Sequence, residues 1–357
     1  HVDHEGGVWN TWPREIAMRQ PEAMASWSRD LAHDIGRHKF AQFLFFDQWL
    51  ALKKYANERG IQIVGDIPIF VAFDSADVWA NPDLFYLDDS GAPTVIAGVP
   101  PDYFSETGQR WGNPLYRWDK MKERGYEWWA RRLSMSFTQA DIVRIDHFRG
   151  FEAYWEIPAE EETAVVGQWV KGPGADFFQV MRDELGELPL IAEDLGVITP
   201  EVEALRDRFD FPGMKILQFA FGGEHNSAFL PHTFDKNCVV YTGTHDNETV
   251  AGWYQNATEG ERDHLRRYLG VSGQDVSWDM IRLAWMSVAD MALTMMQDLM
   301  GLGNEARMNF PGKVGGYWRW RYTPEMVTDA TVQRLKDFTV IYGRHPQDEP
   351  DANQPSG

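Results

Sequence analysis

The feature of this 357-residue sequence that most limits its fold is a repeated alternation of short apolar runs with longer amphipathic segments. Short apolar runs between polar residues indicate strands, whereas apolar residues at helical spacing indicate helices. Alternating strands and helices indicate parallel βαβ units. We therefore expect an α/β fold. Six strands are expected, near residues 61, 141, 188, 214, 238 and 306, with helices over 26–59, 126–138, 176–185, 259–268, 280–300 and 324–338.

Four of the expected strands end in an acidic residue, namely Asp66, Asp146, Glu193 and Asp246. In a β/α barrel the carboxyl ends of the strands face the active site. A single acidic strand end would carry little meaning. Four such ends in register indicate one shared site.

The stretch Asp141–Gly150 shows the change from core to site most clearly. It begins as an apolar strand and then carries the polar residues Arg144, Asp146, His147 and Arg149. An aspartate flanked by two arginines should stay ionised at neutral pH, because nearby positive charge favours the carboxylate. Such a residue suits a nucleophile or a metal ligand, while a structural ion pair is the plainer alternative.

Composition excludes several classes of partner. The net charge of −20 argues against nucleic acid or an anionic membrane as a partner, since both require a basic face. The single cysteine, Cys238, excludes an intrachain disulfide and makes a reducing compartment, the cytoplasm, the default expectation. We recognise no signal peptide and no apolar run long enough to span a bilayer.

Aromatic residues are concentrated in irregular parts of the sequence. The chain has 16 Trp, 21 Phe and 12 Tyr, and many of them lie in stretches rich in Gly, Pro and Asp. Two long segments, residues 73–119 and 150–174, have no clear periodicity, and loops of that length are usually functional. A flat indole face matches the C–H face of a pyranose ring, and carboxylates and amides bond its hydroxyl groups. We therefore expect a sugar-binding cleft.

The acidic residues suit glycoside chemistry. Retaining cleavage requires a carboxylate nucleophile and a carboxylic acid about 5–5.5 Å apart. Asp146 and Glu193 end consecutive strands, and adjacent strands lie about 4.8 Å apart. Asp246 would face the same sugar and raise the pKa of Glu193 by like-charge repulsion. The alternative is Mg²⁺ bound by Asp66, Asp146 and Glu193, but Arg144 beside Asp146 disfavours a dense cation site.

Seven short motifs lie within roughly residues 40–322. The motifs are Gly-Asp66-Ile-Pro-Ile-Phe-Val, Asp74-Ser-Ala-Asp-Val-Trp-Ala-Asn, Pro100-Pro-Asp-Tyr-Phe-Ser-Glu-Thr-Gly-Gln-Arg-Trp-Gly-Asn-Pro114, Arg144-Ile-Asp-His-Phe-Arg-Gly, Ala192-Glu-Asp-Leu-Gly, Gly243-Thr-His-Asp-Asn and Arg307-Met-Asn-Phe-Pro-Gly. Together they resemble the 4-α-glucanotransferase family (amylomaltase, or disproportionating enzyme), a branch of the α-amylase clan. Each motif alone is weak, but the seven follow the family's order.

The resemblance implies a (β/α)8 TIM-type barrel with inserted loop subdomains. The catalytic barrel is expected over residues 1–345, with inserted segments at 73–119 and 150–174, and a polar tail is expected at 346–357. The family's barrel begins upstream of this sequence, so its first two strands are expected to be missing here.

The resemblance also assigns roles to single residues. It implies that Asp146 is the nucleophile, Glu193 the acid/base and Asp246 the transition-state stabiliser. Arg144 would position Asp146, and His245 would bond a sugar hydroxyl. The full set of residues expected to bind or orient the substrate is Arg144, His147, His245, Asp66, Asp102, Tyr103, Phe104, Gln109, Trp111, Asn309 and Pro311.

Plainer alternatives stay open for three of these residues. Asp66 could be purely structural, His147 could be a fully hydrogen-bonded histidine, and Trp111 could be a packing residue. The sequence also departs from the family at Gly316-Tyr317-Trp318, where Gly-Asn-Trp is expected, so the packing of that loop is in question.

The expected activity is the transfer of α-1,4-glucan segments to the 4-hydroxyl of another glucan or of glucose, by a retaining double displacement. The expected substrates are maltooligosaccharides and dextrins from starch or glycogen. Neither a cofactor nor a metal is expected. The two alternatives are an α-glucan hydrolase of the same clan and an inactive glucan-binding fragment.

Overall fold

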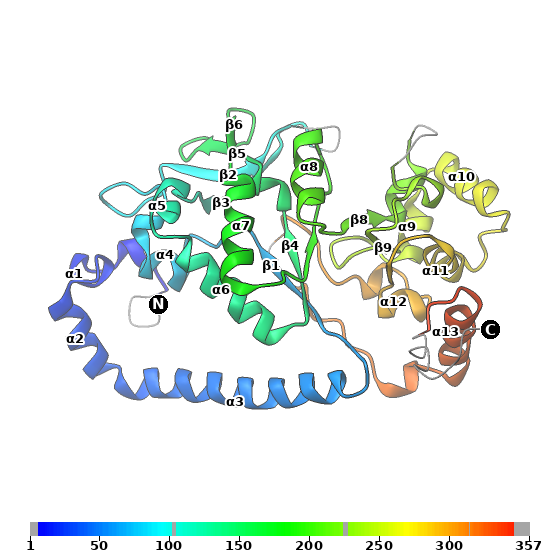
Figure 1. Ribbon diagram of the computed structural model, residues 1–357, viewed down its shortest axis with the longest axis horizontal. Coiled ribbons are helices and arrows are strands. Elements are labelled where there is room, and N and C mark those ends of the chain that lie inside the picture. Colours follow the sequence, from blue (N-terminus) through cyan, green and yellow to red (C-terminus); the bar gives the residue numbers. More distant parts are fainter. Residues whose placement is uncertain (1–5, 102–104, 224–227, 314, 346–357) are drawn as a thin grey trace, which may run out of the picture. The chain divides into compact units, whose positions relative to one another are not determined.

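The computed structural model describes residues 6–101, 105–223, 228–313 and 315–345 (Figure 1). The chain divides into two compact units, His1–Phe211 and Pro212–Gly357. Each unit contains a parallel sheet and a hydrophobic core of its own. Within the described residues, no helix combines the length and the apolar character that a membrane span requires.

The first unit contains a three-stranded parallel sheet in the order β1-β4-β7. Its strands are β1 (Val64–Pro68), β4 (Ile142–Asp146) and β7 (Leu190–Ala192). Asp66 pairs in register with Arg144, and Ile145 pairs with Ala192. The register therefore brings the expected catalytic residues of these three strands to the same edge of the sheet.

Helices connect and cover these strands. Helix α6 precedes β4 and contacts β1 and β4, and helix α7 lies between β4 and β7 in the chain (Figure 1). These βαβ connections confirm the expected α/β class. The helices of the first unit are α1 (Arg14–Ala17), α2 (Pro21–Asp30), α3 (Ala32–Asn57), α4 (Ala76–Ala80), α5 (Trp118–Glu123), α6 (Glu127–Gln139), α7 (Gly174–Leu185) and α8 (Pro200–Arg208), with 3₁₀ turns η2 (Trp9–Thr11), η3 (Pro82–Leu84) and η4 (Phe148–Phe151).

The helix predicted over residues 26–59 forms as two helices, α2 and α3, which meet at Leu31. No residue of α3 is buried, and Phe40 and Phe43 are more than half exposed. The indole N–H of Trp49 donates to the last carbonyl of α6 over 2.8 Å. This hydrogen bond is one of the contacts between α3 and α6.

The two segments that were predicted to be irregular instead form one antiparallel sheet, in the order β3-β2-β5-β6. Its strands are β2 (Val95–Val99), β3 (Gln109–Pro114), β5 (Ala153–Pro158) and β6 (Gln168–Lys171). Strand β2 pairs with β5, so the sheet joins segment 73–119 to segment 150–174. Gly98 permits the close approach of β3, because a Cβ there would lie 2.2 Å from the carbonyl oxygen of Gln109.

The second unit contains a parallel sheet in the order β10-β9-β8. Its strands are β8 (Gly213–Ile216), β9 (Cys238–Tyr241) and β10 (Met291–Leu293). The helices are α9 (Val250–Asn256), α10 (Glu259–Leu269), α11 (Val276–Met286), α12 (Met296–Leu299) and α13 (Asp329–Ile341), with 3₁₀ turns η5 (Leu217–Phe221), η6 (Pro231–Thr233), η7 (Asn304–Ala306) and η8 (Pro324–Met326).

Two expectations for the second unit are wrong. The sixth strand lies at β10 rather than near residue 306, where the chain forms η7. The helix predicted over residues 280–300 ends at Met286, and β10 follows within the same apolar stretch. A short apolar run fits a strand and a buried helix equally well, so its periodicity alone could not decide between them.

The two sheets confirm the α/β class, whereas closure into a barrel remains a prediction.

Candidate active site

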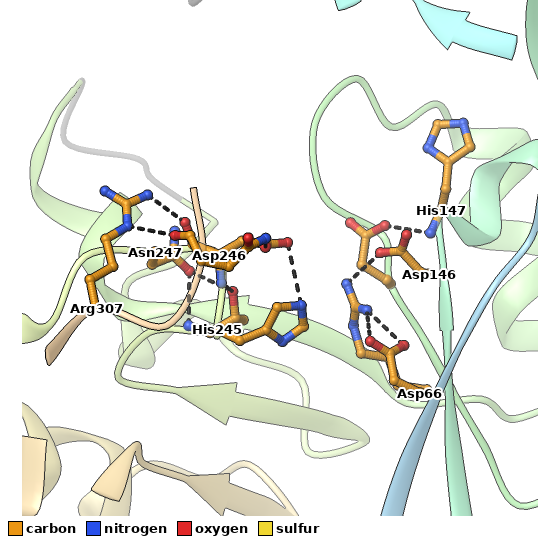
Figure 2. A network of polar contacts seen from close by, with 11 residues as sticks. Asp66, Asp146, His147, His245, Asp246, Asn247 and Arg307 are labelled. Carbon is orange, nitrogen blue, oxygen red and sulfur yellow. Dashed lines mark hydrogen bonds and ion pairs between the residues drawn. The ribbon is translucent and has the colours of Figure 1, made fainter. Parts of the chain in front are cut away.

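The first group of predicted site residues lies on β1 and β4. Asp146 ends β4, but β1 continues to Pro68, so the expectation that this strand ends at Asp66 is wrong. Asp66 and Arg144 face each other in the middle of the two strands. One nitrogen of Arg144, Nη1, donates to both carboxylate oxygens of Asp66, at 2.9 Å each (Figure 2). The other, Nη2, donates to Oδ1 of Asp146 at 2.8 Å. The Arg144 side chain is largely buried, whereas 45% of the Asp146 side chain is exposed. Arg144 therefore orients Asp146 and leaves it accessible.

The same contacts bear on the metal alternative. A cationic guanidinium group bonds both Asp66 and Asp146, two of the three carboxylates that a Mg²⁺ site would require. A divalent cation beside that group would be repelled by its charge. The arrangement favours a fixed carboxylate nucleophile over a metal ligand.

Glu193 follows β7 and is buried beside this group. The backbone N–H groups of His147 and Leu195 donate to its two carboxylate oxygens, at 2.7 and 2.9 Å. Burial is the main cause that raises the pKa of Glu193 to about 7; Arg144 lowers it and Asp146 raises it. The like charge that raises this pKa is that of Asp146, and a contribution from Asp246 remains a prediction. A carboxyl group with this pKa can both donate and accept a proton near neutral pH.

His147 adopts the left-handed conformation, with a φ of 57°. Its ring is buried, and its Nε2 atom has no hydrogen-bond partner among the described residues, which argues against a fully hydrogen-bonded histidine. Burial lowers the pKa of His147 to about 4, which makes the imidazole neutral at neutral pH. A neutral imidazole can accept a hydrogen bond at one ring nitrogen and donate one at the other.

The side chain of Trp111 lies against His147. Their ring centroids are 4.7 Å apart, and the rings are nearly perpendicular, at 88°. The indole N–H donates to Oε1 of Gln109 at 3.1 Å, and 38% of Trp111 is exposed. Strand β3 therefore brings both predicted residues, Gln109 and Trp111, to the site. Three other predicted residues of this loop, Asp102, Tyr103 and Phe104, lie outside the described residues.

Arg149, the second arginine of the Asp146 stretch, makes its described contacts away from Asp146. Its guanidinium group lies 3.8 Å from the ring centroid of Trp169 and donates to the carbonyl oxygen of Val197. Arg206 of α8 donates to Asp194 in the same loop. The two arginines therefore fix the loop that follows Glu193.

A separate group of predicted residues lies in the second unit, on the loop after β9. The side-chain amide of Asn309 donates to Oδ1 of Asp246 at 2.7 Å. Nε2 of His245 lies 3.5 Å from Oδ2 of the same carboxylate. Asp246 lies within a loop, not at a strand end as expected. Asn309, predicted only as part of a loop over the cleft, contacts this carboxylate directly, and Pro311 is exposed in the same loop.

Sequence reasoning missed Arg307, although it opens one of the seven motifs. Its Nη2 donates to the carbonyl oxygen of Asp246 at 2.7 Å, and its Nε donates to that of Asn309 at 2.8 Å (Figure 2). The guanidinium group therefore links the loop of Asp246 to the segment of Asn309.

Sequence reasoning also missed Trp318. Its ring centroid lies 5.1 Å from that of His245, yet 51% of the residue is exposed. Its φ is 63°, an unusual value for a bulky residue, and its N–H donates to the carbonyl oxygen of Met308 at 2.8 Å. The unexpected Tyr317 packs on Phe310, with centroids 5.4 Å apart, so the altered loop still packs.

Comparisons with known proteins agree with these motifs. A sequence model of the family described as 4-alpha-glucanotransferase matches residues 1–328. The 4-alpha-glucanotransferase of Synechocystis sp. is 51% identical over 345 residues, which are 96% of this chain and 68% of that relative. The Thermus thermophilus 4-alpha-glucanotransferase is 53% identical over 341 residues, covering 93% and 68% of the two chains. The solved amylomaltase from Streptococcus agalactiae in complex with acarbose has a TM-score of 0.92 and 40% identity, covering 96% of this chain and 70% of that chain.

Proposed function

Because this chain belongs to the 4-alpha-glucanotransferase family, we propose that it transfers α-1,4-glucan segments by a retaining double displacement at Asp146. Glucan transfer is the activity of the family, and hydrolysis is the less favoured alternative. The observation that carries the mechanism is the pairing of an exposed carboxylate fixed by Arg144 with the buried Glu193, whose pKa is about 7.

The first displacement forms a glycosyl-enzyme. A carboxylate oxygen of Asp146 attacks the anomeric carbon of the donor glucan while the bond to the leaving oxygen breaks. The acid form of Glu193 gives its proton to that oxygen, and the shortened glucan leaves with a free 4-hydroxyl group. Asp146 is then bound covalently to the sugar and Glu193 is a carboxylate, as the second displacement requires.

The second displacement reverses these roles. Glu193, now a carboxylate, removes the proton from the 4-hydroxyl of an acceptor glucan. The acceptor oxygen attacks the anomeric carbon and releases Asp146. The two inversions leave the α configuration unchanged, and no cofactor takes part.

The remaining residues bind and orient the sugar. His147, whose neutral ring lies against Trp111, is proposed to contribute to the sugar subsite. The exposed faces of Trp111 and Trp318 are proposed to stack on glucose rings, each next to a histidine. Transfer exceeds hydrolysis only if the acceptor is held better than water, and such contacts support this by positioning.

Asp246 is proposed as the transition-state stabiliser. Its assignment rests on the Gly243–Asn247 motif, and the bond from Asn309 supports it by fixing the carboxylate. His245 is proposed to bond a sugar hydroxyl. Asp66 is proposed to act through Arg144, because both of its oxygens bond that guanidinium group.

The finer statements about fold and context are also proposals. The two parallel sheets are proposed to be parts of a (β/α)8 barrel over residues 1–345, interrupted by segments 73–119 and 150–174. The proposed substrates are maltooligosaccharides and dextrins of starch or glycogen, and the acarbose complex of the solved relative supports a glucan-like ligand. The proposed location is the cytoplasm.

Incubation with maltotriose alone distinguishes transfer from hydrolysis. Transfer yields glucose together with maltooligosaccharides longer than maltotriose, without a net gain in reducing ends. Hydrolysis yields shorter products and a net gain in reducing ends. Variant Asp146→Asn should yield neither set, and equal activity in that variant would overturn the role of Asp146.

A further inference from the structure

Helix α12 carries two adjacent buried polar side chains, Gln297 and Asp298, which the proposed mechanism does not use. Asp298 is fully buried and Gln297 is 6% exposed. Removing a carboxyl group from water is costly unless its oxygens receive hydrogen bonds. The partners of these two side chains therefore indicate why the helix contains them.

Asp298 holds both ends of the loop that carries Asp246. Its Oδ2 accepts from the hydroxyl of Thr242, the residue directly after β9, at 2.7 Å. Its Oδ1 accepts from the backbone N–H of Val250, the first residue of α9, at 2.8 Å. One side chain thus spans the two points at which the loop leaves and rejoins regular structure.

Gln297 holds the second segment that contacts Asp246. Its side-chain amide donates to the carbonyl oxygen of Ala306 at 3.1 Å. Ala306 precedes Arg307, whose guanidinium group bonds the carbonyl oxygens of Asp246 and Asn309. The two neighbouring side chains of α12 therefore fix both segments that surround the carboxylate.

We propose that Asp298, assisted by Gln297, is a positioning residue that sets the place of the Asp246 carboxylate. The inference rests on the proposed catalytic role of Asp246. An aspartate suits this position because it is short and offers two acceptor oxygens to two donors. Asparagine keeps one acceptor for the N–H of Val250, and its amide can donate to Thr242, whose hydroxyl then accepts.

The test compares Asp298→Ala and Asp298→Asn with the parent chain, using kcat and KM for maltotriose at a temperature well below each Tm. A transition-state contact that is misplaced by about 1 Å costs about 100-fold in rate. Asp298→Ala should therefore lower kcat about 100-fold with little change in KM. Asp298→Asn should recover most of that loss, and Thr242→Val, which removes one of the two bonds, should fall between parent and Asp298→Ala. Asp263→Ala, an exposed acid on α10, is the matched control.

A role limited to stability predicts a lower Tm for Asp298→Ala with the parent kcat, and that result would overturn the proposal. A second readout does not need activity. Amide hydrogen exchange of residues 243–249 should rise in Asp298→Ala and stay at the parent level in Asp263→Ala. If the parent chain forms no transfer products, the proposed function fails. The exchange experiment still tests the positioning role in that case, because unchanged exchange of residues 243–249 in Asp298→Ala would overturn it.

Discussion

The backbone N–H of His147 donates to Oε2 of Glu193 over 2.7 Å. His147 directly follows Asp146, so a single peptide unit links the proposed nucleophile to the proposed acid/base. The left-handed conformation of His147, with a φ of 57°, is sparsely populated for residues other than glycine. The carboxyl group of Glu193 is thereby held beside Asp146 while burial raises its pKa.

Transfer activity should decline as pH rises through about 7, because the first displacement needs the acid form of Glu193, whose pKa is raised to about 7. The measurement is kcat/KM for maltotriose over a range of about pH 5 to 9. Variant Glu193→Gln should lose about 100- to 10,000-fold in rate, and its residual rate should lack this decline. A parent profile that stays flat to pH 9 would contradict the assignment.

Replacement of Arg144 by lysine should lower kcat about 10- to 100-fold and leave KM nearly unchanged. A lysine ammonium is a point charge and cannot reproduce the planar fork that bonds Asp66 and Asp146 together. The control is Arg131→Lys, whose side chain is 78% exposed and pairs with Glu127 on the same helix. If Arg144→Lys keeps the kcat of the parent, Asp146 does not depend on the paired hydrogen bonds of the guanidinium group.

Removal of the Trp318 indole should weaken substrate binding. An exposed aromatic face that contributes about 1 kcal/mol to sugar binding corresponds to about a five-fold rise in KM when it is lost. Trp318→Ala should show this rise with little change in kcat, and Trp318→Phe should retain most of the affinity because it keeps a flat face. An unchanged KM in Trp318→Ala would contradict the proposed stacking.

Asp298 should make stability depend on pH. Burial raises its pKa from 3.8 to about 6. The contribution of the protonated carboxyl group to the free energy of unfolding is therefore fully present below about pH 4 and is lost as pH rises through about 6. A shift of this size corresponds to about 3 kcal/mol. The Tm of Asp298→Asn relative to that of the parent should therefore rise between pH 4 and pH 7. A constant Tm difference across that range would contradict the raised pKa.

The sequence could predict those parts of the site where the side chains change from apolar to polar within one short stretch. The stretch around Asp146 passes from apolar to polar within a few residues, and so does the one around Glu193. Such a change marks the end of a buried strand, and β4 and β7 end there. The motif resemblance added the roles of these residues.

The parts that could not be predicted depend on pairing between distant residues. Arg307 and Asp246 are 61 residues apart, and Asp298 lies 56 residues from Thr242. The antiparallel pairing of β2 with β5 likewise joins two separate segments rich in glycine and proline. Periodicity reports only the local face of a strand or helix, so it carries no information on such partners.

The most direct test of the account is to trap the glycosyl-enzyme in Glu193→Gln. An α-maltosyl fluoride donor needs no acid, because fluoride leaves without protonation, so Asp146 can still attack. Release of the sugar needs the missing base, so the adduct should accumulate. Mass spectrometry of the digested protein should then locate one maltosyl group on the peptide that contains Asp146, and the double variant with Asp146→Asn should carry none. An adduct on another carboxylate, or equal labelling in the double variant, would contradict Asp146 as the nucleophile.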